Sequence, residues 1–242
     1  LETLENGNAA KRWLLSTLDQ KDLPRHLLAV TASPDKAEVF GVASDNIFPF
    51  WDWVGGRYSM WSAIGLSIAI THGGESFAEL LKGAHAMDEH FFATPLAKNV
   101  PALLALLEDH YVNDLDVHSV AVLPYTHRLR LLPDYLQQLC MESNGKRVTG
   151  SGGSVQGRTC PVVWGCSGTV GQHSFYQLLH QGTELIPADF ILPLSVSSET
   201  QSDDKRDLHL IANCLAQSKA MYEGKSIEQA KHESIAAGAD EK

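Results

Sequence analysis

Apolar residues along the chain follow two patterns, and the first is a set of short, nearly continuous runs. Three such runs cover residues 119–123, 161–164 and 186–194, and the first of them stops at Pro124. Runs of this length are typical of strands that are buried on both faces of a parallel sheet. A shorter run at residues 26–31 predicts a further strand near the start of the chain.

The second pattern is helical, with apolar residues every three or four positions. In residues 75–92 the apolar stripe consists of Phe77, Leu80, Leu81, Ala84, Met87 and Phe91. Comparable stripes predict helices over residues 7–20, 60–71 (with Ser59 as the cap), 101–111, 128–141, 172–180, 208–222 and from 226 onward. Because the strands alternate with helices, the sequence predicts an α/β fold with a mostly parallel sheet flanked by helices.

Composition and charge narrow the class of protein. Of 242 residues, 44% are hydrophobic and 20% are charged, which are the values of an ordinary folded chain. With 19 Lys and Arg against 29 Asp and Glu, the formal net charge is −10. A nucleic-acid partner requires a basic surface, so we expect none. The most apolar stretch, residues 60–70, is too short to span a bilayer, so we expect no membrane partner either.

The cysteines, the histidines and a glycine-rich loop give no metal or cofactor motif. The four cysteines lack Cys-x-x-Cys spacing, which favours reduced thiols in a cytoplasmic protein, and Cys166 is interpreted as a bystander thiol. His85 and His90 lie five residues apart, which is the wrong spacing for a His-Glu-x-x-His zinc site. Residues 149–157 lack the Lys-Ser/Thr of a phosphate-binding loop, so they predict a flexible turn. We therefore expect no metal and no cofactor.

Four polar residues are candidates for a functional site, and three of them have a structural alternative. His173 lies at a predicted helix start beyond a strand, where ligands collect in open α/β sheets, but structural histidines are common. Glu142 lies at the end of a predicted helix. It is either a general base beside a cleft or a solvated surface residue. Gln138, four residues earlier, shares its helix face. Arg57 lies among aromatic residues and glycines. Its guanidinium is either held in place by these neighbours for a functional role or forms a structural ion pair with Asp52.

Three segments around these residues resemble the phosphoglucose isomerase family. Residues 50–70, with Gly-Gly-Arg-Tyr-Ser at their centre, resemble the family's signature. Residues 141–146, Met-Glu-Ser-Asn-Gly-Lys, resemble its catalytic-carboxylate motif, and residues 171–183 resemble its catalytic-histidine segment. The three segments follow one another in the family's order, and the similarity covers nearly all of residues 1–242.

The resemblance implies a fold, an activity and an assembly. The fold is a three-layer, sugar-isomerase (SIS) type of α/β domain, with residues 1–48 as the C-terminal part of a first lobe and residues 49–242 as most of a second. The implied activity is the aldose–ketose interconversion of glucose 6-phosphate and fructose 6-phosphate through an enediolate, as in glycolysis and gluconeogenesis. The implied assembly is a homodimer with shared active sites, and no metal or organic cofactor takes part.

The resemblance also implies a role for each candidate residue. Glu142 matches the base that moves a proton between C2 and C1 of the sugar phosphate. Arg57 matches the residue that stabilises the enediolate. His173 matches the ring-opening histidine, which reaches into the partner subunit's site, and Gln138 matches a substrate-contacting residue.

The chain departs from the family's pattern in two respects. The first lobe's phosphate-binding loops and the family's C-terminal lysine have no counterpart in residues 1–242. Cys166, Ser167 and Val170 replace the family's usual Glu, Pro and Asn. The resemblance therefore implies an internal piece of the enzyme that is inactive by itself. The alternative is a non-catalytic SIS-type module that binds sugar phosphates or mediates interactions.

Overall fold

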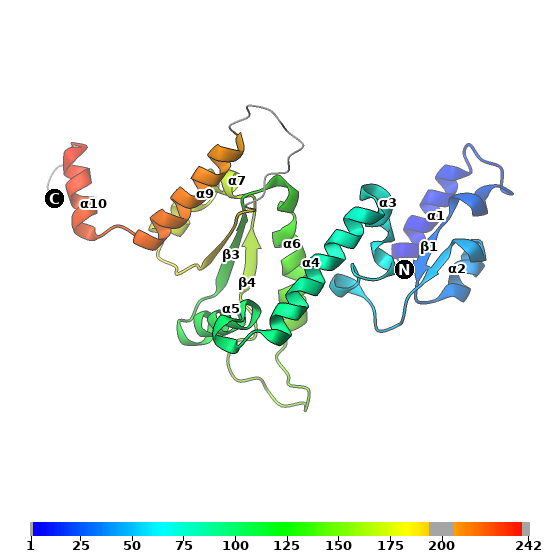
Figure 1. The fold of residues 1–242 in the computed structure, drawn as a ribbon, viewed down its shortest axis with the longest axis horizontal. Helices are drawn as coiled ribbons and strands as arrows, with labels where there is room; N and C mark the ends of the chain where they lie inside the picture. The colour runs from blue at the N-terminus through cyan, green and yellow to red at the C-terminus, as the bar shows by residue number, and fades with distance from the viewer. Residues whose placement is uncertain (1, 194–205, 239–242) are drawn as a thin grey trace. The chain divides into compact units, whose positions relative to one another are not determined.

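The computed structural model describes residues 2–193 and 206–238, and the chain divides into two compact units (Figure 1). The first unit is Leu1–Pro95 and the second is Leu96–Lys242. The lobe boundary that the resemblance implies, between residues 48 and 49, falls inside the first unit and stays a prediction. Within the described ranges, no helix is both long enough and apolar enough to cross a membrane.

The first unit opens with a helix and a small parallel sheet. Its first elements are α1 (Glu2–Leu14), η1 (Leu23–His26), β1 (Ala29–Thr31), α2 (Pro34–Phe40), η2 (Ser44–Asn46) and β2 (Ile47–Pro49). The strands β1 and β2 pair in parallel, with Ala29 opposite Ile47. The sequence pattern predicted β1 but missed α2 and β2. A seven-residue helix and a three-residue strand that ends in proline are too short to leave a periodic signal.

Helix α1 lies earlier in the chain than the predicted range of 7–20. It includes Gly7, a residue type that usually weakens a helix interior. A Cβ atom at Gly7 would lie 2.8 Å from the ring of Phe40, which belongs to α2. Glycine at position 7 therefore allows α1 to pack closely on α2. This tertiary contact extends the helix to residues before Gly7, where the apolar pattern predicted none.

The rest of the first unit consists of two 3-10 turns and two helices. They are η3 (Gly56–Tyr58), η4 (Ala63–Gly65), α3 (Leu66–His72) and α4 (Gly74–Ala93). Helix α4 confirms the prediction over residues 75–92. The prediction of a buried helix that starts after Ser59 is wrong: the Ser59 hydroxyl donates to the carbonyl of Gly56 at 2.6 Å. The hydroxyl of Ser62 accepts from the backbone N–H two residues later at 3.2 Å. These local bonds compete with helix formation and delay it to α3, whose residues are half-buried or exposed.

The second unit is built around a three-stranded parallel sheet. Its elements are η5 (Leu96–Lys98), α5 (Val100–Asp109), η6 (His110–Asp114), β3 (Ser119–Pro124), η7 (His127–Leu129), α6 (Leu132–Leu136), η8 (Gln137–Glu142), β4 (Val162–Gly165), α7 (Gly168–Gln172), α8 (Tyr176–Gln181), β5 (Ala188–Ile191), α9 (Arg206–Glu223) and α10 (Ile227–Ala236). The strand order is β4–β3–β5, and both pairs are parallel. The three apolar runs thus form three strands, although residue 194 of the third run lies outside the described residues. The predicted α/β class is confirmed.

Side chains along β3 alternate between two layers of helices. The buried core on one face consists of Ala121, Leu123, Tyr125, Tyr176 and Cys214. This face is covered by α8 and α9, which supply the last two of these residues. Val122 and Pro124 point to the opposite face and are buried there, on the side of α6, which packs against β3 and β4. The arrangement is helix, sheet, helix (Figure 1).

Two helices of the second unit begin at clear caps. The side chain of Asn99 accepts from the N–H of Ala102 at 3.2 Å, and Pro101 lies in the first turn of α5, as predicted. In α10, Ser226 and Gln229 form a capping box, in which each side chain bonds the other's backbone N–H. The helices predicted from Pro101, over 208–222 and after 226 are confirmed.

Candidate active site

Gln138 and Glu142 lie on η8, a π-helical turn that follows directly on α6. The sequence predicted one helix over residues 128–141, but the chain forms η7, the short helix α6 and then this π-helical turn. Such turns are rare and occur frequently at functional sites. Both candidate residues are exposed.

Two contacts with Val163 fix η8 against β4. The side-chain amide of Gln137 donates to the carbonyl of Val163 at 3.1 Å, and the N–H of Val163 donates to Met141 Sδ at 3.4 Å. Gln137 and Met141 are the sequence neighbours of Gln138 and Glu142. The contacts therefore attach the backbone that carries both candidates to the sheet.

The turn after Glu142 explains the residue types that follow it. The N–H of Gly145 donates to the carbonyl of Met141 at 2.9 Å, and a Cβ atom at residue 145 would lie 2.4 Å from that oxygen. Lys146 Nζ donates to the carbonyl of Glu142 at 2.5 Å. Within the part of the chain that the structure describes, the buried hydroxyl of Ser143 has no hydrogen-bond partner. Glycine and lysine in this motif thus close the end of η8.

His173 directly follows α7 and is its C-cap residue. Its N–H donates to the carbonyl of Val170 at 3.2 Å, and its side chain is exposed. The prediction of one helix over residues 172–180 is wrong, because α7 ends at Gln172 and α8 begins at Tyr176. Three residues lie between them, and the last of these, Phe175, has φ −142°, which is outside the helical range and interrupts the helix.

Helix α7 lies so close to the core that two of its positions require glycine. A Cβ atom at Gly168 would lie 2.1 Å from the ring of Tyr125, and one at Gly171 would lie 2.9 Å from the rings of Phe175 and Tyr176. Because Tyr125 directly follows β3, this packing places α7 beyond the carboxyl ends of the strands. His173 therefore lies beyond the carboxyl ends of the strands, as predicted, but it follows the end of a helix and does not stand at a helix start.

Cys166, which lies between β4 and α7, is not an activated thiol. Its Sγ donates to the carbonyl of Ser167 at 3.4 Å. Burial raises the pKa of this thiol, whereas a nucleophilic cysteine needs a lowered pKa. The environment of Cys166 supports its interpretation as a bystander.

Arg57 belongs to the first unit, on η3. Its guanidinium carbon lies 5.2 Å from the centre of the Tyr58 ring, which is within the range of a cation–π contact. Gly56, just before it, has φ 55°, a left-handed value that favours glycine. Trp51 and Trp53 stack with their ring centres 5.3 Å apart. Arg57 itself is half-buried.

Glu142 and His173 lie at opposite ends of the sheet in the second unit. Asn144, two residues after Glu142, lines a cavity of about 250 Å³ together with Pro161, which comes just before β4. His173 follows α7, which begins beyond the other end of β4 (Figure 1). The structure therefore does not bring Glu142 and His173 together within one chain, and it places Arg57 in the other unit.

The same cavity borders titratable groups that the sequence analysis missed. Burial raises the pKa of Glu108, and the charge of Asp189 raises it further. Burial, with the charges of Glu108 and Cys140, raises the pKa of Cys160 to about 11. These groups come from separate elements, so no local motif could have revealed them. Their environment opposes negative charge in the interior of the second unit.

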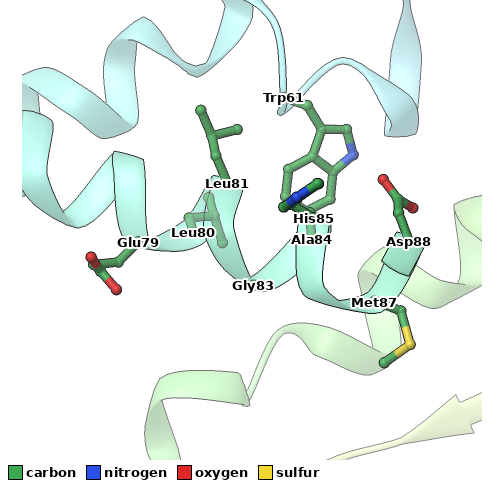
Figure 2. Close-up of a pocket in the computed structure, with 9 residues that line it drawn as sticks. All are labelled: Trp61, Glu79, Leu80, Leu81, Gly83, Ala84, His85, Met87 and Asp88. Carbon is green, nitrogen blue, oxygen red and sulfur yellow. The ribbon is translucent and has the colours of Figure 1, made fainter. Parts of the chain in front are cut away.

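A larger pocket of about 950 Å³ lies beside α4 in the first unit (Figure 2). Trp61 covers one side of it, and residues of α4 between Glu79 and Asp88 form the rest. None of the four candidate residues lines this pocket. In the described ranges, no three His, Cys, Asp or Glu side chains are arranged to hold a metal ion. All four cysteines are free thiols.

The fold and the candidate site define an α/β protein with a parallel sheet, a carboxylate on a π-helical turn at one end and a histidine after a glycine-rich short helix at the other. The sequence profile of the phosphoglucose isomerase family matches residues 1–242. The chain belongs to the phosphoglucose isomerase family.

Similar proteins include several that carry the name glucose-6-phosphate isomerase. The one from Chlorobium luteolum is 53% identical over 241 residues, which are 99% of this chain and 43% of that protein. The one from Marinomonas sp. is 50% identical over 240 residues, with the same two coverages. The chain thus spans less than half the length of these curated relatives.

Two solved structures share the fold. The crystal structure of a glucose-6-phosphate isomerase from Chlamydia trachomatis matches with a TM-score of 0.80 and 34% identity, over 91% of this chain and 43% of that one. A hypothetical protein from Thermus thermophilus matches with a TM-score of 0.71 and 28% identity, over 92% of this chain and 55% of that one.

Proposed function

We propose that residues 1–242 form part of the catalytic machinery of an enzyme that interconverts glucose 6-phosphate and fructose 6-phosphate. The observation that carries this proposal is the family match over residues 1–242, because that range contains Arg57, Glu142 and His173 in their three motifs. The reaction is an aldose–ketose isomerisation through an enediolate. We place it in the cytoplasm, in glycolysis and gluconeogenesis.

Glu142 is the base in this proposal. Its carboxylate takes the proton from C2 of the open-chain aldose and returns it to C1, while the hydroxyl proton on O2 passes to O1, and these two transfers convert the aldose to the ketose. The attachment of η8 to Val163 supports this role, because a base works best on a rigid element. Gln138, exposed on the same turn, contacts the hydroxyl groups of the substrate.

Arg57 stabilises the charge that the proton transfer creates. When C2 loses its proton, negative charge develops on the carbonyl oxygen of the substrate. A fixed guanidinium stabilises that charge more in the transition state than in the ground state. The half-buried position of Arg57 beside Tyr58 supports this role.

His173 opens the sugar ring by exchanging a proton with the ring oxygen, which an imidazole does well near neutral pH. Because Glu142 and His173 lie at opposite ends of the sheet, we infer that one active site takes them from two chains. The assembly in this proposal is a homodimer, in which Glu142 of one subunit works with the partner subunit's His173.

The variant Glu142→Gln tests the role of the base. The test uses a chimera in which residues 1–242 replace the matching segment of the Chlorobium luteolum relative. The amide keeps the size of the side chain but takes no proton from carbon, so the isomerisation rate should fall by about 10²–10⁴-fold. Exchange of the C2 hydrogen with deuterated solvent should be lost in parallel.

The matched control for this test is Glu184→Gln, which changes an exposed glutamate of the same unit and should leave the rate as it is. Hydrogen exchange by the Glu142 variant at the rate of the parent chimera would remove Glu142 from the mechanism. A parent chimera that binds sugar phosphates without turnover would favour the alternative, a non-catalytic SIS-type binding module.

A further inference from the structure

Two buried tyrosines form a hydrogen-bond network that the proposed reaction does not use. The hydroxyl oxygens of Tyr125 and Tyr176 lie 2.8 Å apart, and Gln172 Nε2 donates to the Tyr125 hydroxyl at 3.2 Å. Tyr125 is 1% exposed and Tyr176 is 4% exposed. Neither side chain has the exposure needed to contact a substrate, so any influence on the reaction passes through another residue.

Gln172 connects this network to His173, because Gln172 is the last residue of α7 and His173 is the next residue. Helix α7 has five residues, and a helix this short is not stable through its own hydrogen bonds. Its position is therefore set by tertiary contacts. Gly168 holds its first turn against the ring of Tyr125, and the side chain of Gln172 holds its last turn through the Tyr125 hydroxyl.

The Gln172–Tyr125 bond is a side-chain hydrogen bond between α7 and the core, made by the residue next to the histidine. At Gly168 and Gly171 the contact with the aromatic rings is apolar and fixes how closely α7 approaches the core. The hydrogen bond from Gln172 also restricts the orientation of α7, because a hydrogen bond weakens steeply when its angle departs far from linear. Burial raises the pKa of both phenols above their ordinary values, so both hydroxyls stay protonated through neutral pH.

We propose that Tyr125, acting through Gln172, is a positioning residue for His173. The buried hydroxyl fixes the side chain of Gln172, and this fixes the end of α7 from which the imidazole projects. The inference rests on the proposed function, which assigns ring opening to His173. Misplacing a catalytic group by about 1 Å lowers a rate by as much as 10²-fold.

The test is a double-mutant cycle in the chimera described above. Tyr125→Phe removes the hydroxyl and keeps the ring that packs on Gly168. We expect it to lower kcat by about 10-fold with the parent histidine and by less than about 2-fold when His173→Ala is also present. Gln172→Met removes the other partner of the Gln172–Tyr125 hydrogen bond, at a half-buried residue of α7. It should give the same loss and the same dependence on His173, even if Tyr125→Phe fails to fold.

Tyr176→Phe is the matched control. It removes a buried hydroxyl from the same network, so it carries a comparable cost in stability, but it leaves the Gln172–Tyr125 bond in place. Its kcat should stay within about 2-fold of the parent's. A loss as large as that of Tyr125→Phe would show that general core damage, not positioning, lowers the rate.

The outcomes separate this inference from the proposed function. If His173→Ala lowers kcat but the loss from Tyr125→Phe or Gln172→Met is the same in both backgrounds, the positioning role is overturned and the function stands. No loss from Gln172→Met in the parent background overturns it as well. If His173→Ala leaves kcat unchanged, the role of His173 fails and the positioning role fails with it.

Discussion

At the scale of single residues, Glu108 is a carboxylate whose surroundings oppose its charge. Burial raises its pKa above the ordinary value of 4.5, and Asp189 raises it further. The folded state therefore binds the proton of Glu108 more tightly than the unfolded state does. Its contribution to stability is present below pH 4.5 and is lost as the pH rises through the folded-state pKa.

We therefore predict that Glu108→Gln raises the melting temperature of the chain at pH 7 and leaves it nearly unchanged at pH 4. Glutamine keeps the shape of the protonated carboxyl but never acquires a charge, so the gain should grow as the pH rises above 4.5. Thermal unfolding followed from pH 4 to pH 8 measures this. The exposed Glu184→Gln serves as the control, and an equal shift at pH 4 and pH 7 would contradict the prediction.

The sequence identified the four candidate residues but did not decide among their roles. Taken by themselves, Glu142 and His173 each had a structural alternative, and the choice came from the resemblance to a family. The position of His173 depends on Gly168 packing against the ring of Tyr125. These two residues are far apart in the chain, so no local spacing could have predicted that contact.

At the scale of elements, Asn113 on η6 holds the long segment between η8 and β4. Its side-chain oxygen accepts from the N–H of Arg158 at 2.8 Å, and its side-chain nitrogen donates to the carbonyl of Arg158 at 3.2 Å. Arg158 is also paired with Asp116 at 2.7 Å. This segment begins directly after Glu142, the candidate base. The contact at Arg158 fixes the other end of the segment, close to β4.

We predict that Asn113→Ala exposes the backbone of this segment. Loss of two hydrogen bonds should destabilise it by about 1–2 kcal/mol, so the amide of Arg158 should exchange about 10-fold faster with deuterated water. Trypsin should also cut faster after Lys146 and Arg147. Arg158→Ala is the control, because it removes the ion pair with Asp116 and keeps the backbone contact. Unchanged exchange at residue 158 in Asn113→Ala would refute the prediction.

Elements with long apolar patterns were predicted well, and short or irregular ones were not. The strand over residues 119–123 and the helix over 75–92 agree with β3 and α4 because burial and helical spacing extend over many residues. The π-helical turn η8 gave no signal of its own. Its form depends on the contacts of Gln137 and Met141 with Val163, which are tertiary and leave no trace in local spacing.

At the scale of the whole molecule, the separation of Glu142 from His173 gives a test of the proposed dimer. A chimera with Glu142→Gln and a chimera with His173→Ala should each have little activity alone. After the two are unfolded and refolded together, half of the dimers contain one chain of each kind. If sites are shared, each mixed dimer has one site with both residues intact.

We predict that this mixture recovers about one quarter of the parent activity, because half of the dimers have one of two sites restored. The measurement is the isomerase rate per milligram of refolded protein. Each variant refolded by itself is the control. A mixture that stays as inactive as its components would show that Glu142 and His173 act within one chain, and the dimer with shared sites would have to be abandoned.

Strand β3 lies in the middle of its sheet, yet it is the first of the three strands that a ribosome makes. Its partners β4 and β5 follow only at residues 162–165 and 188–191. At synthesis rates of about 5–20 residues per second, β3 spends several seconds outside the ribosome with both of its edges unpaired. Ala121 and Leu123, which are 0% exposed in the folded chain, are uncovered during that interval. We therefore expect the nascent chain to be most prone to misassembly between the emergence of β3 and that of β5, and chaperones that recognise apolar strands to bind it there.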